Sequence, residues 1–127
     1  MSTDTPMITG TDFVVIPTRD VEKAIPFYRD VLGLRESKRW GNMPAIEFET
    51  GSLTLALMQS EAFGIDFNPS TNPIAMHVDD YEGVKATLES RGVEFQGDTI
   101  DSGVCWQIYF QDPDGNVLGI HHRYAQG

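Results

Sequence analysis

The sequence predicts an α+β protein made of two copies of one β-α-β-β-β unit. An apolar strand pattern, an aspartate, a helical pattern and a glycine occur twice, about sixty residues apart, in VVIPTRDVEKAIPFYRDVLGL from Val14 and IAMHVDDYEGVKATLESRGVEF from Ile74. After each helical stretch the hydrophobic period changes from about 3.6 to 2, which marks a change from helix to strand. Each half therefore contains a strand, a helix and three further strands.

Each predicted helix begins after an aspartate and ends at a glycine. Asp20 and Asp80 can accept hydrogen bonds from the free backbone N–H groups at a helix start. Apolar residues then recur at helical spacing and give each helix one buried stripe. Gly33 and Gly92 follow, where a left-handed residue can end the helix. Pro26 removes a helical N–H, so we expect the first helix to kink near its start.

Alternating patterns predict eight strands. They lie near residues 12–17, 34–39, 45–50 and 53–59 in the first half, and near 73–79, 93–97, 104–111 and 116–122 in the second. The turn-forming stretches ETGS and DPDGN join the last two strands of each half. We expect one domain over residues 1–127, with modules at 8–60 and 73–123 and an irregular linker at 61–72.

Composition and charge narrow the class of protein. With 40% hydrophobic and 22% charged residues, no apolar run long enough for a bilayer and no basic-then-apolar leader, the chain is expected to be cytoplasmic. A single cysteine, Cys105, cannot form an internal disulfide, which fits a reducing compartment. The formal net charge of −10 repels phosphate backbones, so we expect neither nucleic acid nor membrane as a partner.

Strand alternation divides each sheet into a face toward its helix and an opposite face. The helix side takes large apolar residues, namely Val14, Ile16, Ile46, Phe48, Leu53, Leu55, Leu57, Ile74, Met76, Val78, Trp106, Ile108, Phe110, Leu118 and Ile120. The opposite face has the mixed polarity of a small-molecule pocket. It comprises Phe13, Val15, Pro17, Glu47, Glu49, Thr54, Ala56, Met58, Ala75, His77, Cys105, Gln107, Tyr109, Val117, Gly119 and His121. We expect Trp40 at its rim, and the HHRY stretch from His121 as a surface or dimer-contact tail.

Three blocks carry a family resemblance. PTRDVEKAIPFYRDVLGL, NPIAMHVDD and FQDPDGNVLGI, in this order on the doubled pattern, resemble the vicinal oxygen chelate superfamily, which contains glyoxalase I, bleomycin resistance proteins, methylmalonyl-CoA epimerase and extradiol dioxygenases. The resemblance covers nearly the whole chain. It implies a glyoxalase/bleomycin-resistance-like fold, in which two modules form a curled mixed sheet around a cleft that is usually completed in a homodimer.

The resemblance also implies where a metal would bind. Metal-dependent members hold a divalent ion with one side chain from the first and one from the last strand of each module. Carried onto this sequence, these positions are Phe13, Ala56, Pro73 and Gly119, with Ala56 fixed only to within one residue. None offers the carboxylate or imidazole that a site of oxygen and nitrogen donors needs. We therefore expect no metal cofactor at the usual place.

His77 and His121 each lie two residues after a position that the resemblance implies for a metal ligand, or close to it on the same strand, namely Gly119 for His121 and the start of the strand before His77. If the first and last strands of the module run parallel, both side chains shift by about 6.6 Å in the same direction and stay neighbours. The pair could hold a displaced divalent metal with Glu47 or water, supply an acid and a base, or form hydrogen bonds with a ligand. The first half offers only Pro17 and Met58 at the matching places.

Two functions stay open. In the first, the protein binds a small, largely apolar molecule without metal, and the candidate ligand-binding residues are Phe13, Trp40, Glu47, Thr54, Met58, His77, Cys105, Gln107, Tyr109 and His121. In the second, it is a lyase, isomerase or dioxygenase in which His77 and His121 are catalytic, with or without a displaced metal. The acidic net charge favours a cationic or neutral ligand. The mixed face argues against a third option, a domain without a small ligand.

Overall fold

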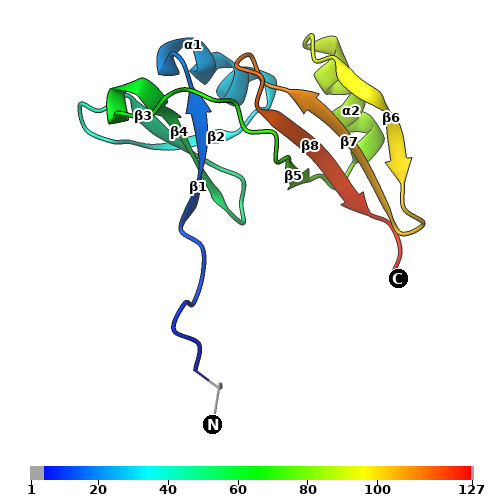
Figure 1. Ribbon diagram of the computed structural model, residues 1–127. Helices are drawn as coiled ribbons and strands as arrows, with labels where there is room; N and C mark the ends of the chain where they lie inside the picture. The colour runs from blue at the N-terminus through cyan, green and yellow to red at the C-terminus, as the bar shows by residue number, and fades with distance from the viewer. Residues whose placement is uncertain (1–4, 127) are drawn as a thin grey trace.

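The computed structural model describes residues 5–126 and contains two four-stranded sheets, each with a helix packed on one face (Figure 1). The elements are β1 (Phe13–Thr18), α1 (Val21–Pro26), the π-helical η1 (Phe27–Val31), β2 (Arg35–Arg39), β3 (Ala45–Glu49), β4 (Thr54–Gln59), the 3₁₀-helical η2 (Ser60–Phe63), β5 (Ile74–His77), α2 (Tyr81–Ser90), β6 (Phe95–Asp101), β7 (Cys105–Gln111) and β8 (Val117–Arg123). The predicted α+β class and the doubled β-α-β-β-β order are confirmed.

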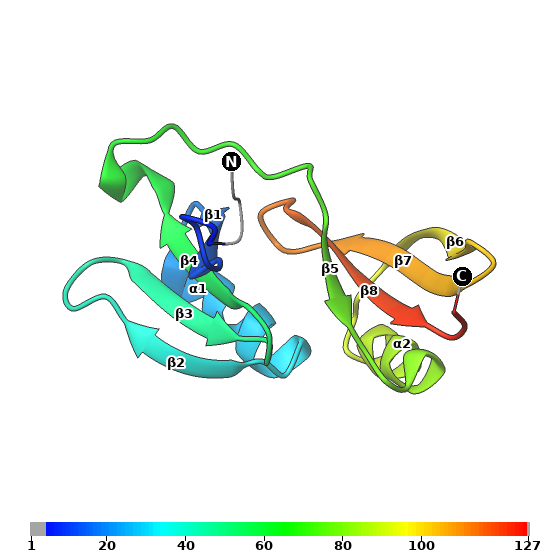
Figure 2. The same cartoon turned by 90° about the horizontal axis from the view of Figure 1, so that it is seen from below.

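The two sheets have the same topology. Their strand orders are β1-β4-β3-β2 and β5-β8-β7-β6. In each sheet the first and last strands of the module pair in parallel, and the other neighbours are antiparallel. The parallel pair is possible because the helix after the first strand carries the chain back to the end of the sheet where that strand began. The modules lie side by side with the extended linker running across one edge, and the two sheets do not join (Figure 2). Strands β1 and β5 are both edge strands.

Seven of the eight strands lie within two residues of their predicted bounds. The exception is β6, which occupies Phe95–Asp101 where residues 93–97 were expected. This strand is exposed along almost its whole length, and its pairing with β7 shifts register between Gln96 and Ile100. Without a buried face, its sequence lacks the alternation from which strand bounds are predicted.

The helix starts and ends follow the prediction, and the helix is irregular at the proline. Asp20 accepts hydrogen bonds from two N–H groups at the start of α1, and Asp80 accepts one at the start of α2. Gly33 and Gly92 have φ values of 70° and 92°. At Pro26 the helix changes its hydrogen-bonding pattern. Pro26 is the last α-helical residue, and because it lacks an N–H the following turn widens into the π-helix η1.

One hydrophobic core extends through both modules. Every residue assigned above to the helix side of a sheet lies in this core or packs against it. The rings of Phe27 in module 1 and Phe110 in module 2 have centroids 6.4 Å apart. The two modules therefore share apolar packing on their helix sides.

The DPDGN turn joins the modules through hydrogen bonds. Asp112 is only 5% exposed, and its carboxylate accepts the backbone N–H groups of Asp114 and Asn116, the Asn116 side-chain amide and the Tyr28 hydroxyl. Tyr28 belongs to module 1 and is fully buried. A buried carboxylate is stable only when its oxygens are hydrogen-bonded, so the turn and the helix of the other module depend on each other.

Further bonds surround this contact. The Asn116 amide donates to the Pro17 carbonyl at 2.8 Å, and the Thr18 hydroxyl donates to Asp114 at 2.5 Å. On the other side of the junction, the Arg91 guanidinium donates to the Val31 carbonyl at 2.9 Å. The helix sides of the two modules are thus held together by polar bonds as well as apolar packing.

Replacement of Tyr28 by phenylalanine tests this junction. Loss of a buried hydrogen bond to a charged group is expected to lower the free energy of unfolding by about 1.5–3 kcal/mol at pH 7. Burial and the neighbouring Asp112 charge raise the pKa of Tyr28 above its ordinary value of 10.0. Its contribution to stability is therefore complete below about pH 10 and is lost as pH rises further, because the unfolded chain releases the proton first. The difference between wild type and Tyr28→Phe should shrink above pH 10.

Urea denaturation at pH 7 and pH 10.5 measures both effects. Tyr124→Phe is the control at pH 7, because the Tyr124 hydroxyl bonds to Asp101 at the exposed surface. A Tyr28→Phe variant as stable as wild type at pH 7 would show that the hydrogen bond does not hold the junction.

Candidate functional site

The opposite face of module 1 carries an aromatic cluster with a carboxylate. Phe13 is 43% exposed, and its ring meets the Trp40 ring edge-on with centroids 5.7 Å apart. The Trp40 indole N–H donates to Glu47 at 2.7 Å, and its ring also contacts Phe63. Trp40 lies in the loop between β2 and β3, and these contacts hold its side chain in place. The structure brings together Phe13, Trp40 and Glu47, as the strand alternation predicts.

The other predicted residues of module 1 lie on the same face. Thr54 is the register partner of Phe13, and its hydroxyl donates to Glu49 at 2.7 Å. Met58 is the partner of Pro17 and is half-buried. The Thr54 hydroxyl is thus already engaged within the protein, whereas Phe13 and Val15 expose apolar surface.

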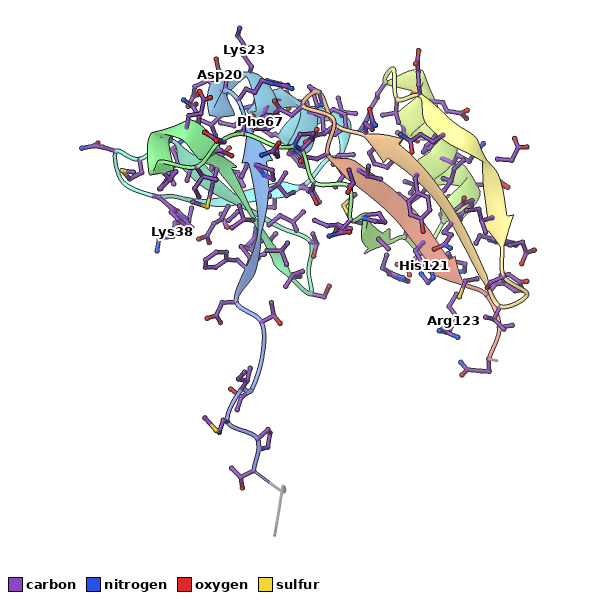
Figure 3. The ribbon with its side chains drawn as sticks, viewed as in Figure 1. Asp20, Lys23, Lys38, Phe67, His121 and Arg123 are labelled. Atoms are coloured by element: carbon purple, nitrogen blue, oxygen red, sulfur yellow. The ribbon has the colours of Figure 1, made fainter. Side chains whose placement is uncertain are left out.

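The opposite face of module 2 carries amide, phenol and imidazole groups in adjacent rows. His121 pairs with His77 on β5 and with Gln107 on β7. Tyr109 pairs with Gly119 in the neighbouring row. His121 lies toward the end of β8 (Figure 3). The expected parallel pairing of His77 with His121 is confirmed at the level of backbone register. Cys105 is 8% exposed and presents little surface to a ligand.

The His77 side chain contacts Asp79 and His122 rather than His121. Its Nε2 lies 2.8 Å from an Asp79 carboxylate oxygen, and its ring contacts the His122 ring with centroids 6.2 Å apart. Within residues 5–126, no ring contact joins His77 to His121, and no group of three or more His, Cys, Asp or Glu residues is arranged to hold a metal ion.

The HHRY stretch is not a tail, because its first three residues belong to β8, whereas Arg123 and Tyr124 lie at the surface as expected. His122 and Arg123 belong to β8, and His122 Nδ1 bonds to the Val78 carbonyl at 2.9 Å. The rings of His122 and Tyr124 lie over Trp106, with centroids 6.0 and 4.8 Å from it. The half-buried Trp106 needs this cover, which explains why the strand continues through the two histidines.

The strand registers settle the counterpart positions of the two modules. Val15 pairs with Ala56 in the first sheet, and Ala75 pairs with Gly119 in the second. Because Val15 and Ala75 are sixty residues apart, like the two modules, Ala56 is the structural counterpart of Gly119. At the four positions that the family resemblance implies for a metal, the chain has Phe13, Ala56, Pro73 and Gly119, none of which carries a carboxylate or an imidazole.

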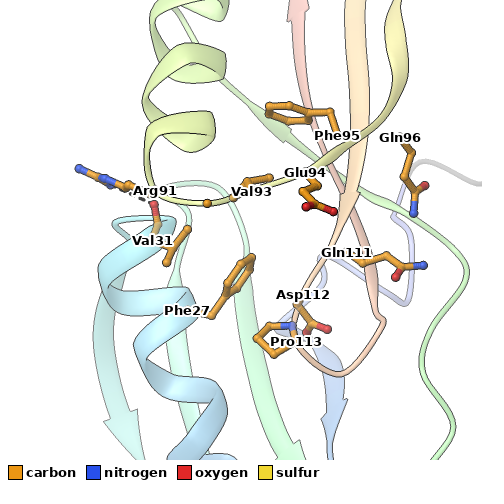
Figure 4. A pocket seen from close by; sticks show the side chains of 11 residues that line it. Phe27, Val31, Arg91, Val93, Glu94, Phe95, Gln96, Gln111, Asp112 and Pro113 are labelled. Carbon is orange, nitrogen blue, oxygen red and sulfur yellow. Dashed lines mark hydrogen bonds between the residues drawn. The ribbon is translucent and has the colours of Figure 1, made fainter.

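Several cavities lie between the modules. Of these four, the two with the greater volumes do not unite the two candidate faces. One of about 520 Å³ opens on the helix side, between η1, the segment 91–96 and the DPDG turn (Figure 4). The other, of about 450 Å³, lies between the β3–β4 turn and β5, with His77 among its lining residues. The aromatic face of module 1 and the polar face of module 2 remain separate surfaces of one chain.

Comparison with known proteins defines the class of protein. Residues 10–120 match the family described as the Glyoxalase/Bleomycin resistance protein/Dioxygenase superfamily. The chain belongs to this superfamily, as its three sequence blocks indicate.

Individual relatives are distant. The chain is 26% identical over 121 residues to glutathione transferase FosA from Serratia marcescens, covering 91% of this chain and 82% of the relative. Among solved structures, a putative glyoxalase family protein from Bacillus anthracis has a TM-score of 0.79 at 21% identity, covering 94% of this chain and 98% of that one. The antibiotic binding protein TnmS3 from Streptomyces sp. CB03234 has a TM-score of 0.76 at 24% identity, covering 94% and 99%. The structural likenesses confirm the glyoxalase/bleomycin-resistance-like fold. Among the described residues, no helix is both long and apolar enough to cross a membrane.

Replacement of Thr54 by valine tests the polar edge of the module 1 face. Hydrogen bonds from Ser37 and Thr54 lower the pKa of Glu49 below its ordinary value of 4.5. We expect Thr54→Val to raise this pKa toward that value, because one bond that favours the ionised carboxylate is lost. The lowered pKa contributes stability above the unfolded-state pKa, and this contribution disappears as pH falls through the folded-state pKa.

Carboxyl chemical shifts measured by NMR from pH 2 to 7 follow the Glu49 titration directly. Thr50→Val serves as the control, because the Thr50 hydroxyl bonds to the Leu53 carbonyl and not to Glu49. An unchanged Glu49 titration in Thr54→Val would contradict the arrangement described.

Proposed function

We propose that the protein binds a small, largely apolar molecule on its sheet faces without the divalent metal of its enzymatic relatives. The observation that carries this proposal is the pairing of two features. The four implied metal positions have no side-chain donor atoms, and the same face of module 1 carries the exposed Phe13 and the half-buried Trp40 beside Glu47. Exposed rings with a few placed polar groups are typical of small-molecule sites.

We propose that a second copy of the chain completes the pocket. In one chain the face of module 1 and the face of module 2 belong to different sheets, and the edge strands β1 and β5 both border these faces. Phe13 and Val15 on β1 are each more than 40% exposed. A homodimer that sets the module 1 face of one copy against the module 2 face of its partner would enclose the aromatic cluster and cover these edges.

The chemistry of the faces favours a flat, cationic or neutral ligand. The Phe13 and Trp40 rings offer stacking surface, and the Gln107 amide opposite His121 offers a donor and an acceptor. The net charge of −10 repels anions. The structural likeness to an antibiotic binding protein supports a role in binding a drug-like molecule. The two proteins need not bind the same ligand.

Binding of flat cations tests the proposal. We expect bleomycin and the planar dye ethidium to quench Trp40 fluorescence saturably, whereas spermine, a cation without rings, should not. Trp40→Ala should weaken binding by roughly tenfold, the size of effect expected for one lost stacking contact. Calorimetry gives the affinity of this variant, and light scattering gives the oligomeric state.

Ile65→Ala is the matched control, because Ile65 is an exposed apolar residue of the linker. If neither ring compound binds, or if Trp40→Ala and Ile65→Ala bind them equally well, the proposed site is wrong. A monomer that binds them with full affinity would reject the shared pocket.

The enzymatic alternative keeps one supporting observation, the register pairing of His77 with His121. In that case the two imidazoles would carry acid–base or metal chemistry, as a lyase, isomerase or dioxygenase of this superfamily requires. The His77 side chain would first have to leave Asp79.

Metal analysis separates the two functions. For protein purified without chelator, we expect substoichiometric zinc, manganese and iron, and His77→Ala and His121→Ala should fold normally with the same metal content. Stoichiometric metal that is lost in both variants, but kept in His122→Ala, would instead establish the enzymatic alternative.

A further inference from the structure

Gly119 is a glycine because the ring of Tyr109 lies across it. A Cβ atom at position 119 would lie 2.7 Å from Cδ1 and 2.9 Å from Cε1 of the Tyr109 ring, closer than Cβ atoms approach other atoms in proteins. The backbone of Gly119 does not have a positive φ, so any residue could adopt its conformation. The Tyr109 ring makes the two shortest of these contacts and the Ile108 carbonyl oxygen the next, at 3.1 Å, as expected where a strand glycine marks the close approach of another group.

The Tyr109 side chain is not completely covered by its neighbours. Gly119 is paired on its other side with Ala75, so two residues without bulky side chains lie side by side across β8 and β5. Tyr109 itself is only partly buried, and within residues 5–126 its hydroxyl makes no hydrogen bond. The Cδ1 and Cε1 atoms of the ring lie against Gly119, so a ligand would contact the remaining exposed part of the side chain and the hydroxyl.

We infer that Tyr109 is the stacking platform that sets ligand specificity, and that it fills the position from which a last-strand metal ligand would project. This inference rests on the proposed function. It adds the class of ligand, a planar aromatic ring system stacked on Tyr109, with Gln107 and the Tyr109 hydroxyl in reach of polar groups on that ring. The absence of a metal-binding side chain at position 119 and the presence of the Tyr109 ring are then linked, because the ring in this orientation leaves no space for a side chain at position 119.

The first experiment needs no ligand. Gly119→Ala should lower the thermal unfolding midpoint by roughly 4–12 °C, the shift that overpacking produces in a domain of this size. In a Tyr109→Ala background, where the ring is absent, Gly119→Ala should cost less than half as much. Equal losses in both backgrounds would show that the ring does not occupy the space and would overturn the inference.

The second experiment separates a platform from plain packing, because an aromatic residue over a strand glycine also stabilises a sheet. With ethidium as the probe, Tyr109→Phe should bind within about threefold of wild type, whereas Tyr109→Leu should bind roughly tenfold more weakly. Gly119→Ala should weaken binding in the same way, because it displaces the ring. Ile65→Ala is again the control.

The outcomes are distinguishable. If wild type binds ethidium and Tyr109→Leu binds it equally well, the platform is wrong while the proposed function stands. If wild type binds neither ethidium nor bleomycin, the proposed function and the ligand class fall together, and the unfolding experiment still decides whether the Tyr109 ring excludes a side chain at position 119.

Discussion

The buried carboxylate of Asp112 is the constraint on which the rest of the structure depends. It organises the DPDGN turn through the Asp114 and Asn116 N–H groups, and it accepts the Tyr28 hydroxyl from the other module. A carboxylate this deeply buried requires all of these bonds, because an unsatisfied charge in the interior costs several kcal/mol. The turn of module 2 and the Tyr28 side chain of module 1 therefore stabilise each other.

This junction decides where a site can form. Because the modules are held together on their helix sides, their opposite faces remain open, with Phe13 and Trp40 on one and Tyr109 and His121 on the other. One chain then supplies two half-sites that do not meet. In the proposed homodimer a partner copy would complete both, and the Tyr109 ring beside Gly119 would contribute to each proposed site.

The sequence was enough to predict the strand order, the two helix caps and the faces of the strands, because alternation and capping are local properties that recur at fixed spacing. The Tyr28–Asp112 bond could not be predicted, since its partners are separated by 84 positions and the helical pattern that includes Tyr28 does not indicate what its hydroxyl contacts. The His77 side chain was placed on the correct strand beside His121, but its rotation toward Asp79 depends on neighbours outside the strand. Gly119 in the middle of an apolar strand was the one local sign of a close approach, although the sequence alone does not show that Tyr109 makes it.

A mixed-dimer experiment tests most directly whether two copies share each pocket. Trp40→Ala disables the module 1 half-site, and Tyr109→Leu disables the module 2 half-site, so each homodimer should bind ethidium weakly. When the two variants are unfolded together and refolded, the heterodimer should regain one pocket of wild-type affinity per dimer, built from the intact Trp40 of one copy and the intact Tyr109 of the other. Heterodimers that bind as weakly as both parents would contradict a pocket shared between copies.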